Sequence, residues 1–122
     1  MTLTELRSGY LLHDAVWTYD LAIPLTDIQY KQLEQILHNL LQNIESMKIE
    51  KQEQLQLLFS QVVTEFEIVV NHAPLDDYGI YNYGGLNNFF AEIAEVFGFP
   101  VKRGVYGQIS NFVYPNINLE DD

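Results

Sequence analysis

Two long stretches of the chain repeat apolar residues at the 3.6-residue spacing of a helix. The first begins at Thr26, an N-cap type of residue, followed by Asp27 in the turn where a helix dipole favours negative charge. Its apolar positions are Ile28, Leu33, Ile36, Leu37, Leu40, Leu41 and Ile44. The pattern predicts a helix over about residues 26–46.

A second helical pattern runs from Leu55 to Val70 after a polar connection at residues 48–54, which could also be a helix start. Leu55, Leu58, Phe59, Val62 and Phe66 fit one face of a helix. Residues 64–70 are rich enough in β-branched side chains to form a strand instead, so both readings stay open there.

A third helix is predicted over about residues 86–97, ended by Gly98 and Pro100. The preceding stretch, residues 74–85, contains turn-forming proline, glycine, aspartate and asparagine and predicts an irregular loop.

Other segments indicate strands. Residues 16–23 alternate, with Trp17, Tyr19, Leu21 and Ile23 on one face, and Pro24 follows them. Residues 101, 105–106 and 109–114 predict short strands or a hairpin. The expected fold class is therefore α+β, with about three helices packed on a small sheet of short, mostly antiparallel strands.

Length and composition favour one globular domain over residues 1–122, with residues 116–122 a frayed acidic tail. The chain has no cysteine, which excludes a disulfide scaffold and cysteine metal sites. Neither a signal peptide nor an apolar run of membrane-spanning length is visible, so we expect a cytoplasmic protein.

The net charge of the chain constrains its function more than any motif does. The 122 residues carry 17 acidic and 6 basic side chains, a formal net charge of -11. Between Lys51 and Lys102 there is no lysine or arginine, yet seven carboxylates occur among residues suited to a core. Such a surface repels nucleic acids and anionic membranes and attracts cationic partners. Acidity that serves only solubility is the competing interpretation.

The segment 76–85 combines two aspartates, three tyrosines and turn residues, a composition typical of interface loops. Its carboxylates and rings could take a partner's arginine, unless the tyrosines fold into the core and the aspartates only solvate a turn. The predicted partner-binding residues are Glu50, Glu53, Glu65, Glu67, Asp76, Asp77, Tyr78, Tyr81, Tyr83, Glu92 and Glu95.

No pattern indicates catalysis or a cofactor. Asp76, Asp77 and Asn82 match no calcium loop, and the three histidines lack zinc-site spacing, so no metal is expected. Paired carboxylates such as Glu65 with Glu67 would need a cleft and unlike environments to act as acid and base. We predict a protein that is not an enzyme.

The whole chain resembles the small acidic neisserial DNA-mimic proteins that bind the histone-like protein HU. The likeness lies in length, acidity, the absence of cysteine, the opening Met1-Thr2-Leu3-Thr4-Glu5-Leu6 and the closing Asn118-Leu119-Glu120-Asp121-Asp122. It implies a monomeric, non-catalytic protein that competes with DNA for HU in the nucleoid. The alternative is an immunity-type or anti-defence inhibitor that plugs the basic active site of a toxin or nuclease.

Overall fold

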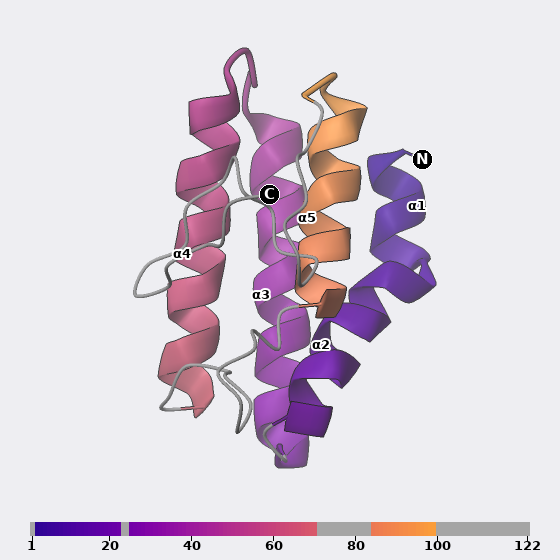
Figure 1. Cartoon of the computed structure of the whole chain (residues 1–122), viewed down its shortest axis with the longest axis vertical. Helices are drawn as coiled ribbons and strands as arrows, with labels where there is room; N and C mark the ends of the chain where they lie inside the picture. The colour runs from indigo at the N-terminus through magenta and orange to yellow at the C-terminus, as the bar shows by residue number, and fades with distance from the viewer. Residues whose placement is uncertain (1, 23–24, 71–83, 100–122) are drawn as a thin grey trace.

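The computed structural model describes residues 2–22, 25–70 and 84–99, and these residues form five α-helices and no strand (Figure 1). The helices are α1 (Leu3–Ser8), α2 (Tyr10–Ala22), α3 (Asp27–Ser46), α4 (Gln52–Val70) and α5 (Gly84–Val96). The described part is therefore all-helical, and the predicted α+β class is wrong. The segments 74–83 and 101–122, for which a loop, short strands and a frayed tail were predicted, lie outside the described residues.

The strand predicted at residues 16–23 is instead the second half of α2, as far as Ala22. The alternation seen from Val16 onward hides a helical period that starts earlier: Leu11, Leu12, Ala15 and Val16 are all buried. They lie at i, i+1, i+4 and i+5, which is one face of a helix and both faces of a strand. Burial of that face against α5 and α3 outweighs the local β-propensity.

α1 and α2 are separated by Gly9, where the chain leaves the helical conformation. A Cβ atom at this position would lie 2.6 Å from the carbonyl oxygen of Glu5, so the close approach requires glycine. α1 begins with a capping box: the Thr2 hydroxyl accepts from the Glu5 amide, and the Glu5 carboxylate accepts from the Thr2 amide.

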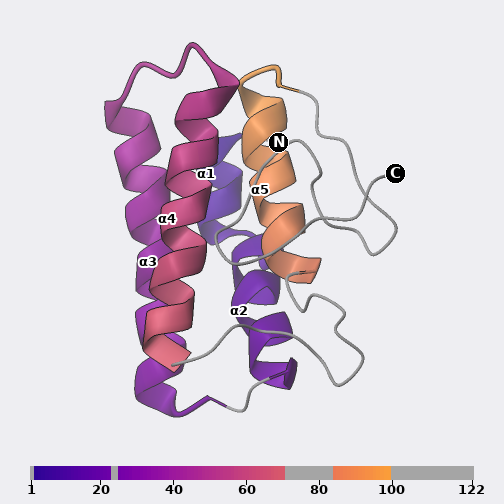
Figure 2. The same ribbon diagram turned by 60° about the vertical axis from the view of Figure 1, so that its left-hand side comes forward.

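α3 confirms the helix predicted over residues 26–46, including its N-cap. The Thr26 hydroxyl accepts from the Gln29 amide at 3.2 Å, and the Gln29 side chain accepts from the Thr26 amide at 3.0 Å. The same Gln29 side chain donates to the carbonyl of Val69 at 3.1 Å. This bond ties the start of α3 to the end of α4, so the two helices form an antiparallel hairpin (Figure 2).

α4 continues as a helix through Val70, which settles the ambiguity at residues 64–70. Phe66 and Val70, four residues apart, both face the core and are buried. Tertiary packing at helical spacing therefore decides the conformation of this β-branched stretch.

α5 begins at Gly84, two residues before its predicted start, and ends close to the predicted position. Gly98 has φ +79° and completes a Schellman motif: its amide donates to the Glu95 carbonyl, and the Phe99 amide donates to the Ala94 carbonyl. The sequence signal of glycine after the helix is confirmed here.

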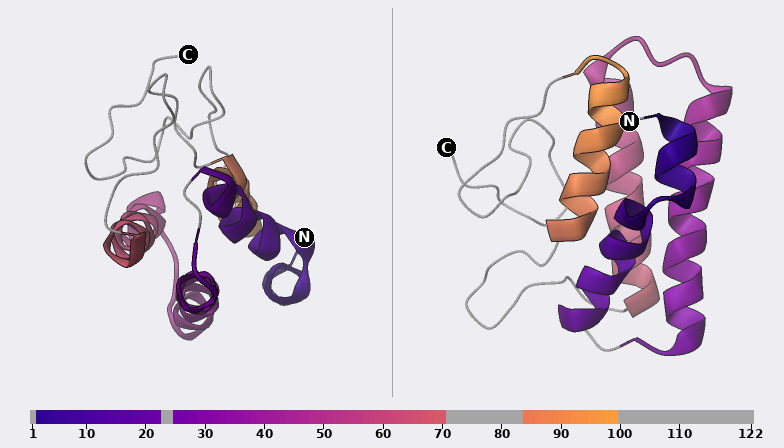
Figure 3. Two further views of the ribbon diagram at one scale, coloured as in Figure 1. Left: turned by 90° about the horizontal axis from the view of Figure 1, so that it is seen from below. Right: turned by 90° about the vertical axis from the view of Figure 1, so that its right-hand side faces the viewer.

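Seen from one end, α3 and α4 form one side of the bundle, while α2 and α5 pair beside them and α1 flanks α2 (Figure 3). The core between these helices contains four fully buried phenylalanines: Phe59, Phe66, Phe89 and Phe90. The rings of Phe59 and Phe90 stack with centroids 4.2 Å apart, which joins α4 to α5. None of the five described helices is both long enough and apolar enough to cross a membrane.

Candidate partner-binding surface

Six of the eleven predicted partner-binding residues lie in the described part of the chain. Glu50 is in the α3–α4 connection, and the other five are on helices without any lysine or arginine. These five are Glu53, Glu65 and Glu67 on α4 and Glu92 and Glu95 on α5. Asp76, Asp77, Tyr78, Tyr81 and Tyr83 lie outside the described residues.

The α3–α4 connection is organised by Gln54, which the sequence analysis did not single out. Its side-chain carbonyl accepts from the amides of Glu50 at 2.7 Å and Lys51 at 2.9 Å. Its side-chain amide donates to the carbonyl of Lys48 at 3.2 Å. Three hydrogen bonds from one side chain thus fix the backbone that carries Glu50 and leads to Glu53. A polar residue three or four positions into a helix is the only sequence signal for this role.

Replacing Gln54 by alanine removes all three hydrogen bonds. We expect the free energy of unfolding, measured by urea denaturation, to fall by about 1–2 kcal/mol. Gln54→Glu keeps the two acceptor contacts and loses only the donor, so its loss should be smaller. Equal stability of the alanine variant and the wild type would show that the three Gln54 hydrogen bonds do not stabilise the connection.

Glu50 has a neighbouring cation, because the Lys48 ammonium lies 3.1 Å from its carboxylate. Both side chains are highly exposed, and such a pair contributes little and is easily exchanged for a partner's cation. Arg7 is similarly paired, with Glu45 at the end of α3. Glu50 is therefore a weaker candidate contact than Glu53, which lies on the base-free helix.

Glu65 and Glu67 do not form a pair. Residues two apart on a helix differ by about 200° around its axis, so these carboxylates lie on different sides of α4. Glu65 is exposed and lines a groove between α3 and α4, whereas Glu67 is half-buried. The groove is about 150 Å³ in volume, and Glu65 is the one charged residue among those lining it. This geometry contradicts an acid–base role for Glu65 with Glu67.

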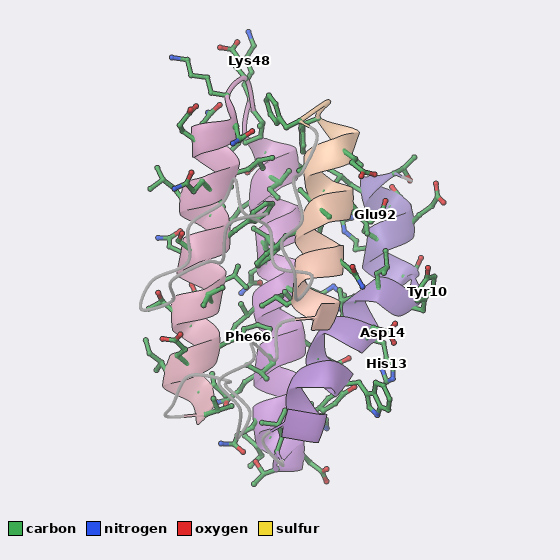
Figure 4. All side chains as sticks on the ribbon, in the orientation of Figure 1. Tyr10, His13, Asp14, Lys48, Phe66 and Glu92 are labelled. Carbon is green, nitrogen blue, oxygen red and sulfur yellow. The ribbon has the colours of Figure 1, made fainter. Side chains whose placement is uncertain are left out.

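Glu92 and Glu95 are three residues apart and share one face of α5 with the exposed Asn88. The labelled Glu92 side chain lies on the side of α5 nearest α1 and is half-buried (Figure 4). Glu95 is exposed near the helix end.

The spacing of the carboxylates is wider than that of DNA phosphates. Glu53 and Glu65 are about three and a third helical turns apart on α4, which separates them by about 18 Å along the axis and about 120° around it. A duplex of that length carries about ten phosphates. α4 therefore presents isolated negative charges on a rigid backbone and not a continuous row.

No three His, Asp or Glu side chains of the described residues are grouped closely enough to hold a metal ion. His13 places Nδ1 3.1 Å from the hydroxyl of Tyr30.

Comparison with known proteins identifies no relative: no family model, no curated protein and no solved structure matches the chain.

Proposed function

We propose that this chain is a DNA-mimic protein: its acidic surface binds the DNA-binding site of a basic protein, HU in the first instance, and competes with DNA. The observation that carries the proposal is the fixed placement of carboxylates on α4 and α5, two helices whose own sequences contain no lysine or arginine. HU as the partner comes from the resemblance of the whole sequence and from nothing in the geometry.

Ordered helices support the proposal because a carboxylate on an ordered backbone loses only side-chain entropy, and no backbone entropy, when a partner binds it. Glu53, Glu65 and Glu95 are exposed, so their carboxylates are reachable by lysine and arginine side chains of a partner. Acidic residues that serve only solubility would not need fixed positions on a helix.

The wide carboxylate spacing defines how the competition would work. A partner would meet a few negative anchors about 18 Å apart on α4 rather than an imitation of every phosphate. Binding would then be steered by charge and sensitive to salt, with the affinity concentrated at few positions.

The test is displacement of a labelled DNA duplex from purified HU, followed by fluorescence anisotropy. We expect the protein to release DNA at low salt and to lose this effect as salt rises from about 50 to 200 mM. Poly-L-glutamate of eleven residues has the same net charge without a fold and should displace far less DNA. Retention of the DNA on HU at a large excess of protein, at low salt, would refute the proposal.

An immunity-type inhibitor would behave differently in a parallel assay. It would leave HU on DNA but abolish the activity of a cognate basic nuclease, and it would use Asp76, Asp77 and the tyrosines at 78, 81 and 83 as a compact contact. No described residue favours this second function over the first.

A further inference from the structure

The outward face of α2 exposes aromatic rings around a carboxylate. Tyr10, His13, Asp14 and Trp17 lie at i, i+3, i+4 and i+7, so the four side chains form one continuous patch over two helical turns. Tyr10 is 68% exposed and Trp17 is 47% exposed. Figure 4 shows the labelled Tyr10, His13 and Asp14 along the outer edge of α2, away from the bundle.

This patch is held on a rigid support. The opposite face of α2 buries Leu11, Leu12, Ala15 and Val16 in the core. On the outward side, the Tyr30 hydroxyl of α3 lies 3.1 Å from His13 Nδ1, and the two rings are tilted by 51°. The His13 ring is therefore held in place without a partner, and the helix backbone fixes the positions from which Tyr10 and Trp17 extend, which lowers the entropy cost of binding.

Exposed tyrosine and tryptophan at this spacing are typical of helices that anchor in a partner. Tyr and Trp dominate interface hot spots, and anchors at i, i+3, i+4 and i+7 are the pattern of helix recognition. Two exposed aromatic side chains two turns apart on one helix face form an exposed apolar surface of the kind that marks interaction sites.

The charges around the patch select a cationic partner. Asp14 lies among the rings and is half-buried, as is Glu34, one turn after Tyr30 on α3; Lys31, adjacent to Tyr30, is exposed. The two carboxylates outnumber the one lysine, and the whole chain has a charge of -11. A cation entering this patch is therefore attracted both by the local carboxylates and by the protein's overall field.

We propose that the Tyr10–Trp17 face of α2 binds an exposed arginine of a basic partner protein. The planar guanidinium can stack on an aromatic ring while it donates two hydrogen bonds to the Asp14 carboxylate. A lysine ammonium is a compact, strongly hydrated charge and does neither as well. The surface thus discriminates between the two cations, which a purely acidic surface does not.

This surface is separate from the carboxylates of α4, because α2 and α4 do not contact one another in the described part of the chain. The inference does not depend on DNA mimicry or on HU. It requires only a partner with an accessible arginine.

Trp17 is the only tryptophan of the chain, so its fluorescence reports on the patch directly. The probes are octa-arginine and octa-lysine, which have the same charge. We expect octa-arginine to change the Trp17 emission and to bind about three- to tenfold more tightly than octa-lysine. Equal affinity of the two peptides, or binding that leaves Trp17 emission unchanged, would overturn the proposal.

Two variants test the residues, with peptide affinities measured by calorimetry. Tyr10→Ala and Asp14→Asn should each bring the ratio of octa-arginine to octa-lysine affinity towards one; Tyr10 is exposed and Asn has nearly the size of Asp, so the helix content measured by circular dichroism should stay unchanged in both. The matched control is Ile68→Ala on α4, a side chain 72% exposed, which should keep the preference. If both α2 variants keep the preference for octa-arginine, the arginine binds at another surface, and the proposal for the Tyr10–Trp17 face is wrong.

Sedimentation of the wild type and of the Tyr10→Ala variant tests whether a second copy of the chain binds this face instead. Sedimentation of the wild type should show a monomer at all concentrations tested. A concentration-dependent dimer that Tyr10→Ala abolishes would make this face a self-interface and would overturn the arginine proposal. Because no DNA-binding protein is present in these assays, their failure would leave the HU experiment unaffected.

Discussion

Replacing Phe59 by alanine should lower the free energy of unfolding by about 3–5 kcal/mol. Phe59 is completely buried in α4, and its ring stacks on Phe90 of α5 at a centroid distance of 4.2 Å. The truncation removes the apolar contacts of the ring and leaves a cavity between the two helices. A domain of this size has about 5–15 kcal/mol of total stability, so the loss is a large part of it.

Urea denaturation followed by circular dichroism measures this effect. The matched control is Leu57→Ala, two residues earlier on the same helix, where the side chain is 71% exposed and the change should stay within about 0.5 kcal/mol. If Phe59→Ala cost no more than Leu57→Ala, α4 and α5 would not pack through this ring pair in solution.

The sequence predicted helices well where caps and apolar period agree. Thr26 at the start of α3 and Gly98 after α5 both have the predicted roles. It failed for α2, because alternation over residues 16–23 is compatible with a strand when read alone. The helix is selected by tertiary packing, which a local pattern does not show: other helices bury Leu11, Leu12, Ala15 and Val16.

The sequence predicted the negative charge of the candidate surface but not the positions of its carboxylates relative to one another. The absence of basic residues between Lys51 and Lys102 is visible in the sequence, and the helical position of Glu95 follows from the helix predicted over residues 86–97. The conformations at Glu53 and Glu65 were left open by the sequence, and the structure places both residues on α4. The separation of Glu65 from Glu67 around α4 required the helix to be established through Val70. The patch at Tyr10–Trp17 was hidden by the same strand assignment, since a strand would place Trp17 differently relative to His13.

Neutralising the exposed carboxylates of α4 and α5 should weaken binding to HU. In the variant Glu53→Gln/Glu65→Gln/Glu95→Gln the three side chains keep their size and lose their charge. If each exposed pair contributes about 0.5–1 kcal/mol, the affinity at low salt should fall about ten- to hundredfold. The difference from the wild type should shrink as salt screens the charges.

A control with the same net charge separates local contacts from the overall field. Ser8→Lys/His38→Lys/Gln42→Lys also adds three positive charges, at exposed positions of α1 and α3. These positions are on helices other than α4 and α5, so the added lysines remove none of the three carboxylates; with both variants compared at physiological salt, where exposed charges are screened, this variant should retain more of its affinity than the first. Equal losses in the two variants would mean that only the net charge matters, and the helical placement of Glu53, Glu65 and Glu95 would then have no role in recognition. A loss confined to the first variant would identify these three carboxylates as the anchors that a DNA-binding protein meets in place of phosphates.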